Sequence, residues 1–173
     1  MSRKYIFRDG DGIYFTSTSV VFWIDVFTRI EYKDILISSI AHCQKEKGLI
    51  VYGYVIMSNH VHLLMSKENT DNSFSDIIRD MQESRREWLI EKFRSAGEVN
   101  SQNTNYQFWQ QNNRPMQLLT SERIESAINY IHQNPVKAGW VAEPEEYLYS
   151  SARNYSDKYS RLKITSVYDG TIV

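Results

Sequence analysis

The stretch that decides the fold is Leu49–Met65, which reads LIVYGYVIMSNHVHLLM. Its first half, Leu49–Met57, is almost wholly apolar, which is typical of a central strand buried on both faces. Ser58 and Asn59 are turn-forming residues, and His60–Met65 is again rich in apolar residues. Two strands joined by so tight a turn pair as an antiparallel hairpin, so a central antiparallel sheet is predicted.

The sequence before this hairpin predicts one more strand and one helix. Ile13–Thr18 is rich in β-branched and aromatic residues, which is typical of a strand. A helix is predicted from about Glu31 to Lys47, with an apolar stripe on one side. Gly48 is expected to end it, because glycine readily adopts the left-handed conformation of helix C-termini.

Two further helices are predicted after the hairpin. Ser73 and Asp76 have the spacing of a capping box, which opens a helix from about Ser75 to Arg94. The second helix is capped by Thr120 or Ser121, and it is expected to end at Asn134-Pro135, because a residue before proline is pushed out of the α region.

The remaining segments are predicted to be less regular. Residues 96–113 are rich in Asn, Gln and Ser, and loops of this length in a small domain are usually functional or mobile. Residues 144–153 indicate short turns and one poorly defined helix. No internal repeat or linker divides the chain, so one domain of α+β class is expected.

Composition and charge exclude several classes of protein. The chain has 173 residues, and 20 basic against 21 acidic side chains give a net charge of -1, which excludes a globally basic nucleic-acid binder but not a local patch. Cys43 is the only cysteine, so a disulfide framework and a thiolate zinc cage are excluded. No apolar run approaches the ~20 residues of a membrane span. An aromatic content of 13%, with 12 tyrosines, favours stacking surfaces over bulk electrostatics.

His60 and His62 are the first candidate site residues. Side chains alternate between the two faces of a strand, so these two imidazoles point the same way, about 6.6 Å apart along the backbone. Val61 between them faces the opposite side, toward a core. Two such imidazoles can converge on one metal ion. The spacing alone equally fits two histidines that are hydrogen-bonded on a polar sheet face.

Tyr130 and Asn134 form a second constellation. They are four residues apart on the predicted helix and are therefore neighbours on one face. A tyrosine in this position is most often a half-buried packing residue with a solvated hydroxyl. Its oxygen can also attack a phosphodiester when the phosphate is polarised. A divalent ion held by two histidines and an amide oxygen would polarise it, and Asn134 supplies that oxygen.

Two motifs, in this order along the chain, resemble those of a known family. Tyr54–Met65, YVIMSNHVHLLM, closely resembles the strand-turn-strand signature of the single-tyrosine HUH transposases, which include insertion-sequence transposases and their REP-associated, domesticated relatives. Tyr130–Gly139, YIHQNPVKAG, looks like the second signature of the REP-associated branch. Tyr147–Ala152, YLYSSA, is similar to the segment that comes after this signature in that branch, and the resemblance runs from about Tyr14 to Tyr155.

The resemblance implies a role for each candidate residue. His60 and His62 are the HUH metal ligands, Tyr130 is the nucleophile, and Asn134 takes the place of the third ligand. Such enzymes bind Mg or Mn, recognise hairpins in single-stranded DNA, and cut by forming a 5′-phosphotyrosine. Their fold is a central antiparallel sheet of ferredoxin/RRM type with helices packed on it. The resemblance further implies a single HUH transposase domain over residues 1–173, a bacterial, nucleoid-associated cytoplasmic location, and either monomers or homodimers.

Two departures from the family pattern leave a second function open. Ser58 stands where relatives usually have proline, and the helix from Ser75 runs directly through residues 81–88, where many relatives have a longer connection. The shorter connection favours a catalytically inactive, domesticated protein that binds DNA hairpins. A third hypothesis, a two-histidine zinc hydrolase, is weaker because no Glu-x-x-His or further histidine completes the usual ligand set.

Three other residues are candidate DNA contacts. Trp109 could stack on an unpaired base, which contributes ~1–3 kcal/mol without any net basic charge. The alternative is that Trp109 is a core anchor beneath the long loop. Arg114 and Lys137 are candidate phosphate contacts.

Overall fold

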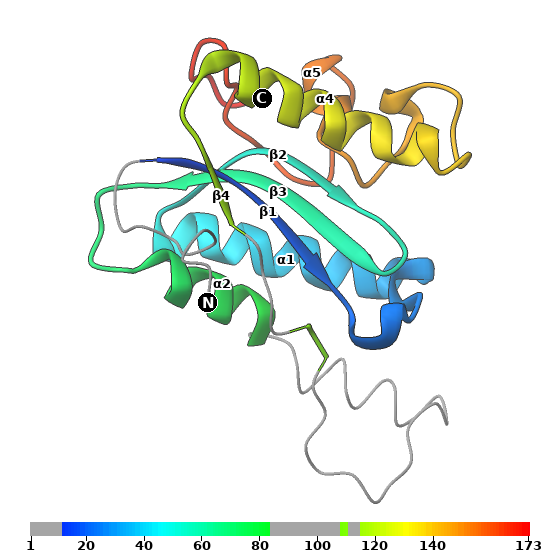
Figure 1. Ribbon diagram of the computed structural model, residues 1–173, viewed down its shortest axis with the longest axis horizontal. Helices are drawn as coiled ribbons and strands as arrows, with labels where there is room; N and C mark the ends of the chain where they lie inside the picture. The colour runs from blue at the N-terminus through cyan, green and yellow to red at the C-terminus, as the bar shows by residue number, and fades with distance from the viewer. Residues whose placement is uncertain (1–11, 84–107, 111–114) are drawn as a thin grey trace, which may run out of the picture.

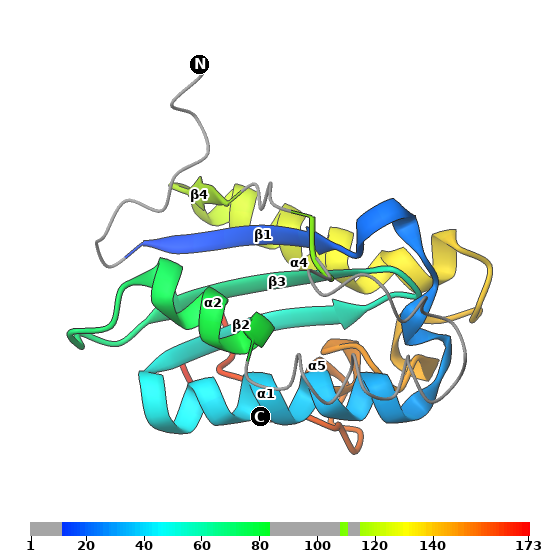
Figure 2. The same cartoon turned by 90° about the horizontal axis from the view of Figure 1, so that it is seen from below.

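The computed structural model describes residues 12–83, 108–110 and 115–173 (Figures 1 and 2). In this part of the chain the elements are, in order, β1 (Ile13–Ser19), η1 (Val21–Trp23), η2 (Val26–Thr28), α1 (Ile30–Lys47), β2 (Leu49–Ile56), β3 (His60–Lys67), α2 (Phe74–Glu83), β4 (Met116–Leu118), α4 (Ser121–Lys137), η3 (Pro144–Glu146) and α5 (Ala152–Tyr155). The predicted hairpin, first strand and first helix are confirmed.

The strands form a 4-stranded sheet in the order β2-β3-β1-β4. β3 pairs antiparallel with β1 and β2, and β1 pairs antiparallel with β4. The chain therefore forms two consecutive units, β1–α1–β2 and β3–α2–β4. In the sheet, β3 lies between the two strands of the first unit, and β1 lies between the two strands of the second. This is a ferredoxin-like arrangement, so the predicted α+β class is confirmed. The sequence does not predict β4, because a strand of 3 residues is too short to show alternation.

Helices cover both faces of the sheet (Figure 1). α1 and α2 lie on one face and α4 lies on the other. Successive residues of β3 point to opposite faces, so Val61 joins the core beneath α1 and α2, whereas Leu64 joins the core beneath α4. Ile128 and Ile131 of α4 complete this second core. The alternation thus places His62, between Val61 and Leu63, on the face that α4 covers.

A glycine in β2 sets how closely α4 approaches the sheet. The pairing of β2 with β3 shifts register between Val51 and Gly53, which marks a β-bulge. A Cβ built on Gly53 would lie 2.7 Å from Cδ1 of Ile128 and 3.5 Å from Oγ of Ser151. Only a residue without a side chain leaves room for the helix at this distance.

The second predicted helix continues past the position where it was expected to end. α4 runs to Lys137 with Pro135 inside it, so the prediction that Asn134-Pro135 ends the helix is wrong. Proline cannot donate a hydrogen bond to the carbonyl four residues earlier, and the helix nevertheless continues through Pro135, which is buried in the fold. The N–H of Ala138 donates to the Asn134 carbonyl (3.0 Å), and Gly139 then adopts a positive φ of 74°. As a result, Lys137 lies on the helix.

The C-terminal segment covers the free edge of β2. The Ile56 N–H donates to the Tyr149 carbonyl (3.0 Å), and the Ser151 N–H donates to the Tyr54 carbonyl (2.9 Å). The hydroxyl of Tyr147 donates to the Ile56 carbonyl (2.8 Å). An edge strand covered in this way cannot pair with another chain.

Two predictions fall partly or wholly on undescribed residues. Ser73 caps α2 as predicted, because its Oγ accepts from the Asp76 N–H (3.1 Å) and donates to the Asp76 carboxylate (2.7 Å). Residues 84–94 of the predicted helix lie outside the described residues, as does most of the predicted loop. Within the described part of the chain, no helix is both long and apolar enough to span a membrane.

Candidate active site

β3 brings His60 and His62 together on the face covered by α4. Their ring centroids lie 4.9 Å apart. The strand is held on both sides here, because His62 is paired with Ser17 of β1 and with Val55 of β2. The structure therefore places the two imidazoles side by side on the most firmly paired strand of the sheet, as the spacing predicts.

A hydrogen-bond chain through Asn59 fixes the orientation of His60. The Asn59 amide nitrogen donates to the Trp23 carbonyl (3.2 Å) and to the Asp25 carboxylate (2.9 Å). Its amide oxygen therefore faces Nδ1 of His60, 2.8 Å away. An amide oxygen only accepts, so the proton sits on Nδ1 and Nε2 keeps its lone pair for a ligand. Burial lowers the pKa of His60, partly offset by a hydrogen bond with the Asn134 side chain.

His62 is buried, and its ring nitrogens lack hydrogen-bond partners among the described residues. It is 4% exposed, and neither Nδ1 nor Nε2 meets a hydrogen-bond partner in the described part of the chain. Burial, followed by the nearby charge of His60, lowers its pKa to about 3, and an interaction with the Thr16 backbone, which does not meet hydrogen-bond geometry at either ring nitrogen, acts in the opposite direction. An unsatisfied buried polar group costs stability and calls for an explanation. A bound ion would supply one.

α4 places Tyr130 beside this pair. The Tyr130 ring lies 5.2 Å from the His62 ring, centroid to centroid. Phe15 of β1 stacks on His62 at 5.4 Å and meets Tyr130 edge-on at 5.8 Å, so the three rings pack as a triangle. Tyr130 is nevertheless 45% exposed. It is held by packing and remains accessible to a large substrate.

Asn134 and Lys137 follow Tyr130 on the same face of α4. The Asn134 amide nitrogen donates to the Tyr130 carbonyl (2.9 Å), so its oxygen is the atom available to the His60 side chain. Nζ of Lys137 lies 5.7 Å from the centroid of the Tyr130 ring. This cation reaches Tyr130 because the helix continues through Pro135. The three residues present an accessible hydroxyl, an amide oxygen and a positive charge together.

The donor set fits a divalent ion. No group of three His, Cys, Asp or Glu side chains gathers among the described residues, so within this part of the chain a third protein ligand would be of another type. Imidazole nitrogen and amide oxygen are both ligands that divalent metals accept. His60 offers Nε2, His62 has unsatisfied nitrogens, and Asn134 lies close enough to His60 to affect its pKa.

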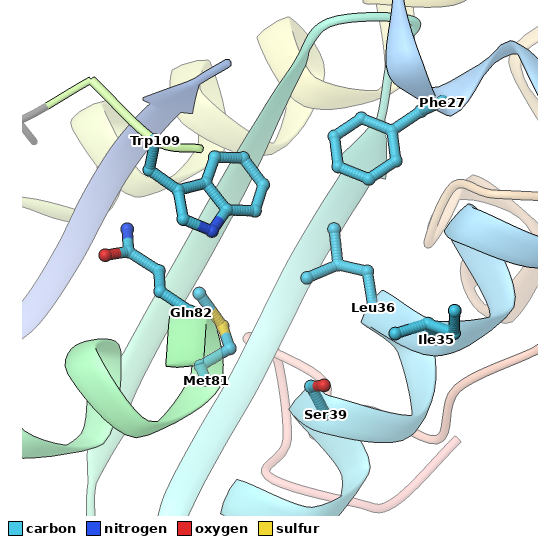
Figure 3. Close-up of a pocket in the computed structure, with 7 residues that line it drawn as sticks. All are labelled: Phe27, Ile35, Leu36, Ser39, Met81, Gln82 and Trp109. Atoms are coloured by element: carbon cyan, nitrogen blue, oxygen red, sulfur yellow. The ribbon is translucent and has the colours of Figure 1, made fainter. Parts of the chain in front are cut away.

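Trp109, one of the predicted DNA-contacting residues, lies away from this site. Trp109 is only 9% exposed, and its ring stacks on Phe27 at 5.7 Å. Figure 3 shows it on the wall of an apolar pocket with Leu36 of α1 and Met81 of α2. This corresponds to the alternative in which Trp109 is a core anchor, and its ring offers no face for a base. Arg114 lies outside the described residues.

Two residues that position the site were not singled out from the sequence. Asn59 appears there only as a turn residue, and its position directly before His60 is the one signal that could have suggested a second role. Phe15 appears only as a strand residue. Its contacts with His62 and Tyr130 depend on the pairing of β1 with β3, which a single sequence does not reveal.

Comparison with known proteins assigns the family. A family model described as "Transposase IS200 like" matches residues 24–134, which is more than half of the chain and includes the histidine pair, Tyr130 and Asn134. The chain belongs to the IS200-like transposase family. The predicted resemblance and the predicted class of enzyme, a transposase, are therefore confirmed. No curated protein matches this transposase.

Two solved structures share the fold of this transposase. A REP-associated tyrosine transposase bound to a REP hairpin superimposes with a TM-score of 0.64 at 18% identity, covering 100% of this chain and 97% of that one. A putative transposase from Deinococcus radiodurans R1 gives a TM-score of 0.50 at 15% identity, covering 76% of this chain and 94% of that one. At these identities the likeness shows the fold alone.

Proposed function

We propose that this transposase cuts and rejoins single-stranded DNA at hairpin ends, with Tyr130 as the nucleophile. The observation that carries the proposal is the position of Tyr130, which packs against His62 yet is 45% exposed. The REP-associated relative of similar fold is bound to a REP hairpin, which supports hairpin DNA as the substrate class. Lys137 beside the tyrosine ring supports a role in binding the phosphate.

The proposed reaction exchanges one phosphate ester for another. The Tyr130 hydroxyl loses its proton as its oxygen attacks phosphorus, a bond between oxygen and phosphorus forms, and the bond from phosphorus to the 3′ oxygen breaks. The departing strand takes up a proton and ends in a 3′-OH. The phosphate stays attached to the 5′ oxygen of the nucleoside on the 3′ side of the cut and is now linked to tyrosine. This 5′-phosphotyrosine conserves the energy of the diester, so attack by a 3′-OH can rejoin a strand.

His60, His62 and Asn134 are the residues that would hold a divalent ion, Mg or Mn. When bound, such an ion supplies positive charge that polarises the phosphodiester. Asn59 orients His60 for this task by keeping the proton on Nδ1. We also propose that residues 1–173 work as one HUH transposase domain, because Tyr147 and Tyr155 of the C-terminal segment pack against both cores.

Trapping the covalent intermediate tests this function. The wild type is incubated with Mn and labelled hairpin oligonucleotides from its own genomic surroundings, and we expect an adduct that survives SDS and disappears on protease treatment. Tyr130→Phe removes one oxygen and keeps the ring, so the fold should persist while the adduct is lost. Tyr159→Phe is the matched control, because Tyr159 is 72% exposed in the C-terminal segment, and it should form the adduct normally. Chelator should prevent adduct formation.

The outcomes separate the hypotheses. An adduct that persists in Tyr130→Phe shows that another of the 12 tyrosines is the nucleophile. Binding of a hairpin by the wild type without an adduct on any of these substrates favours the domesticated, inactive DNA-binding protein.

A further inference from the structure

Three consecutive apolar side chains are exposed directly after β1. Phe22 is 89% exposed, Trp23 58% and Ile24 51%. We call this segment, Phe22–Ile24, the aromatic tip. Single exposed apolar residues are ordinary, but a run of three with two aromatic rings is a contiguous patch of the kind that marks a binding surface. Neither the histidine pair nor Tyr130 accounts for it.

The backbone holds these rings outward at an energetic cost. Phe22 has a φ of 57° and Trp23 a φ of 56°, a left-handed conformation that bulky residues rarely adopt. Such strain persists only where the surroundings impose it, and it clusters at functional sites. Here the N–H of Val21 donates to the Phe108 carbonyl (3.0 Å), and the Trp23 carbonyl accepts from Asn59 (3.2 Å). The tip is thus a braced structure with its rings directed away from the core.

The aromatic tip lies next to the candidate active site. The Trp23 ring is 6.3 Å from the His60 ring, centroid to centroid. The same Asn59 side chain binds the Trp23 carbonyl and orients His60. In Figure 1 the segment after β1 lies at the same end of the sheet as the turn between β2 and β3. A DNA strand with a phosphate at His60 therefore has the Trp23 ring within reach.

We propose that Phe22 and Trp23 form a stacking platform for an unpaired base adjacent to the phosphate that Tyr130 attacks. The proposal rests on the proposed function and adds a second contact to it. Bases stack on exposed aromatic rings regardless of their sequence, and this binding needs no basic charge, in keeping with a net charge of -1.

The test compares the affinities of the protein for two DNA probes, one with unpaired bases and one without them. The first probe is a DNA hairpin with unpaired thymidines on both sides of the stem, and the second carries abasic sites in their place. All proteins carry Tyr130→Phe, so that binding is measured without cleavage. One stacked base corresponds to roughly 5- to 150-fold in affinity, and we expect the thymidine probe to bind more tightly by a factor in this range.

Trp23→Leu removes the aromatic face and keeps an apolar side chain. We expect it to bring the ratio of the two affinities close to one and to leave the affinity for the abasic probe unchanged. Trp23→Phe should keep most of the ratio. Tyr159→Leu is the control, an exposed aromatic in the C-terminal segment, and should leave the ratio unchanged. The melting temperatures of these variants should match, because the replaced rings are exposed.

Three results would overturn the proposal. The first is a ratio that survives in the double variant Phe22→Leu/Trp23→Leu. The second is an unchanged ratio together with Trp23-dependent binding to vesicles of phosphatidylcholine and phosphatidylglycerol, which makes the tip a membrane contact. The third is a Trp23→Leu protein that sediments as a smaller species without DNA, which makes the tip a contact between copies. Because Tyr130→Phe is present throughout, a failed adduct assay leaves this comparison intact, and a missing ratio leaves the nucleophile untouched.

Discussion

Replacing His62 by leucine should stabilise this transposase when a chelator is present. His62 is 4% exposed and both ring nitrogens are without hydrogen-bond partners among the described residues. An unsatisfied buried polar group costs about 1–3 kcal/mol, and an apolar side chain of similar size avoids that cost. We therefore expect His62→Leu to raise the free energy of unfolding by about 1–3 kcal/mol at pH 7, measured by urea denaturation.

The pH dependence gives an independent measure of the same burial. An unfolded histidine takes up a proton below pH 6.5, whereas the pKa of folded His62 is lowered to about 3, first by burial. Between these values the unfolded state binds more protons, so stability rises with pH and is lost as pH falls. From pH 7 to pH 5 the loss due to His62 is about 2 kcal/mol, and any folded pKa well below 5 gives the same figure. His62→Leu should lose correspondingly less stability.

The control is the same substitution at a partly buried histidine that has a hydrogen-bond partner. Nε2 of His132 lies 2.9 Å from Oγ of Ser151, so His132→Leu should lower the free energy of unfolding by about 0.5–1.5 kcal/mol.

Mn should reverse the advantage of His62→Leu. At a free Mn concentration of 100 times the Kd, binding stabilises the wild type by about 2.7 kcal/mol, whereas a variant without the ligand gains no such stability. If His62→Leu destabilises the chelated protein as His132→Leu does, the ring nitrogens are satisfied and the argument for an ion fails.

Two further predictions concern the residues that position the site. Asn59→Ala removes the acceptor that keeps the proton on Nδ1 of His60, and it should weaken Mn binding by roughly 10- to 100-fold in isothermal titration; unchanged affinity would show that Asn59 is only a turn residue. Gly53→Ala places a Cβ 2.7 Å from Cδ1 of Ile128 and should cost about 1–3 kcal/mol in urea denaturation. Ile128→Val removes that Cδ1, so the double variant should be more stable than the sum of the single effects predicts, and strict additivity would contradict the clash.

Much of the fold follows from local patterns. The apolar run before Ser58 and the apolar-rich stretch after it predict the hairpin. Side-chain direction in a strand follows residue parity, so the spacing also predicts that His60 and His62 share a face. Gly48 ends α1 with a φ of 72°, as a glycine at that position predicts. The capping residues Ser73 and Thr120 are likewise confirmed by their hydrogen bonds.

The features that the sequence does not predict depend on contacts between distant segments. A proline rule predicts that α4 ends at Asn134, but the rule describes local preference, and the helix continues to Lys137 with Pro135 buried in the fold. The sequence leaves two roles open for Trp109, a base-stacking residue and a core anchor. Only the position of α1 and α2 around it decides between the two.

The two halves of the candidate site are joined through one packing interface. β3 carries both histidines and is paired on each side, so their spacing is fixed by the sheet. α4 carries Tyr130 and Asn134 four residues apart, so a shift of the helix moves the hydroxyl and the amide together. The distance between Tyr130 and His62 therefore depends on how α4 packs over Gly53. For this reason Gly53→Ala should reduce adduct formation even where it leaves the His60–His62 pair in place.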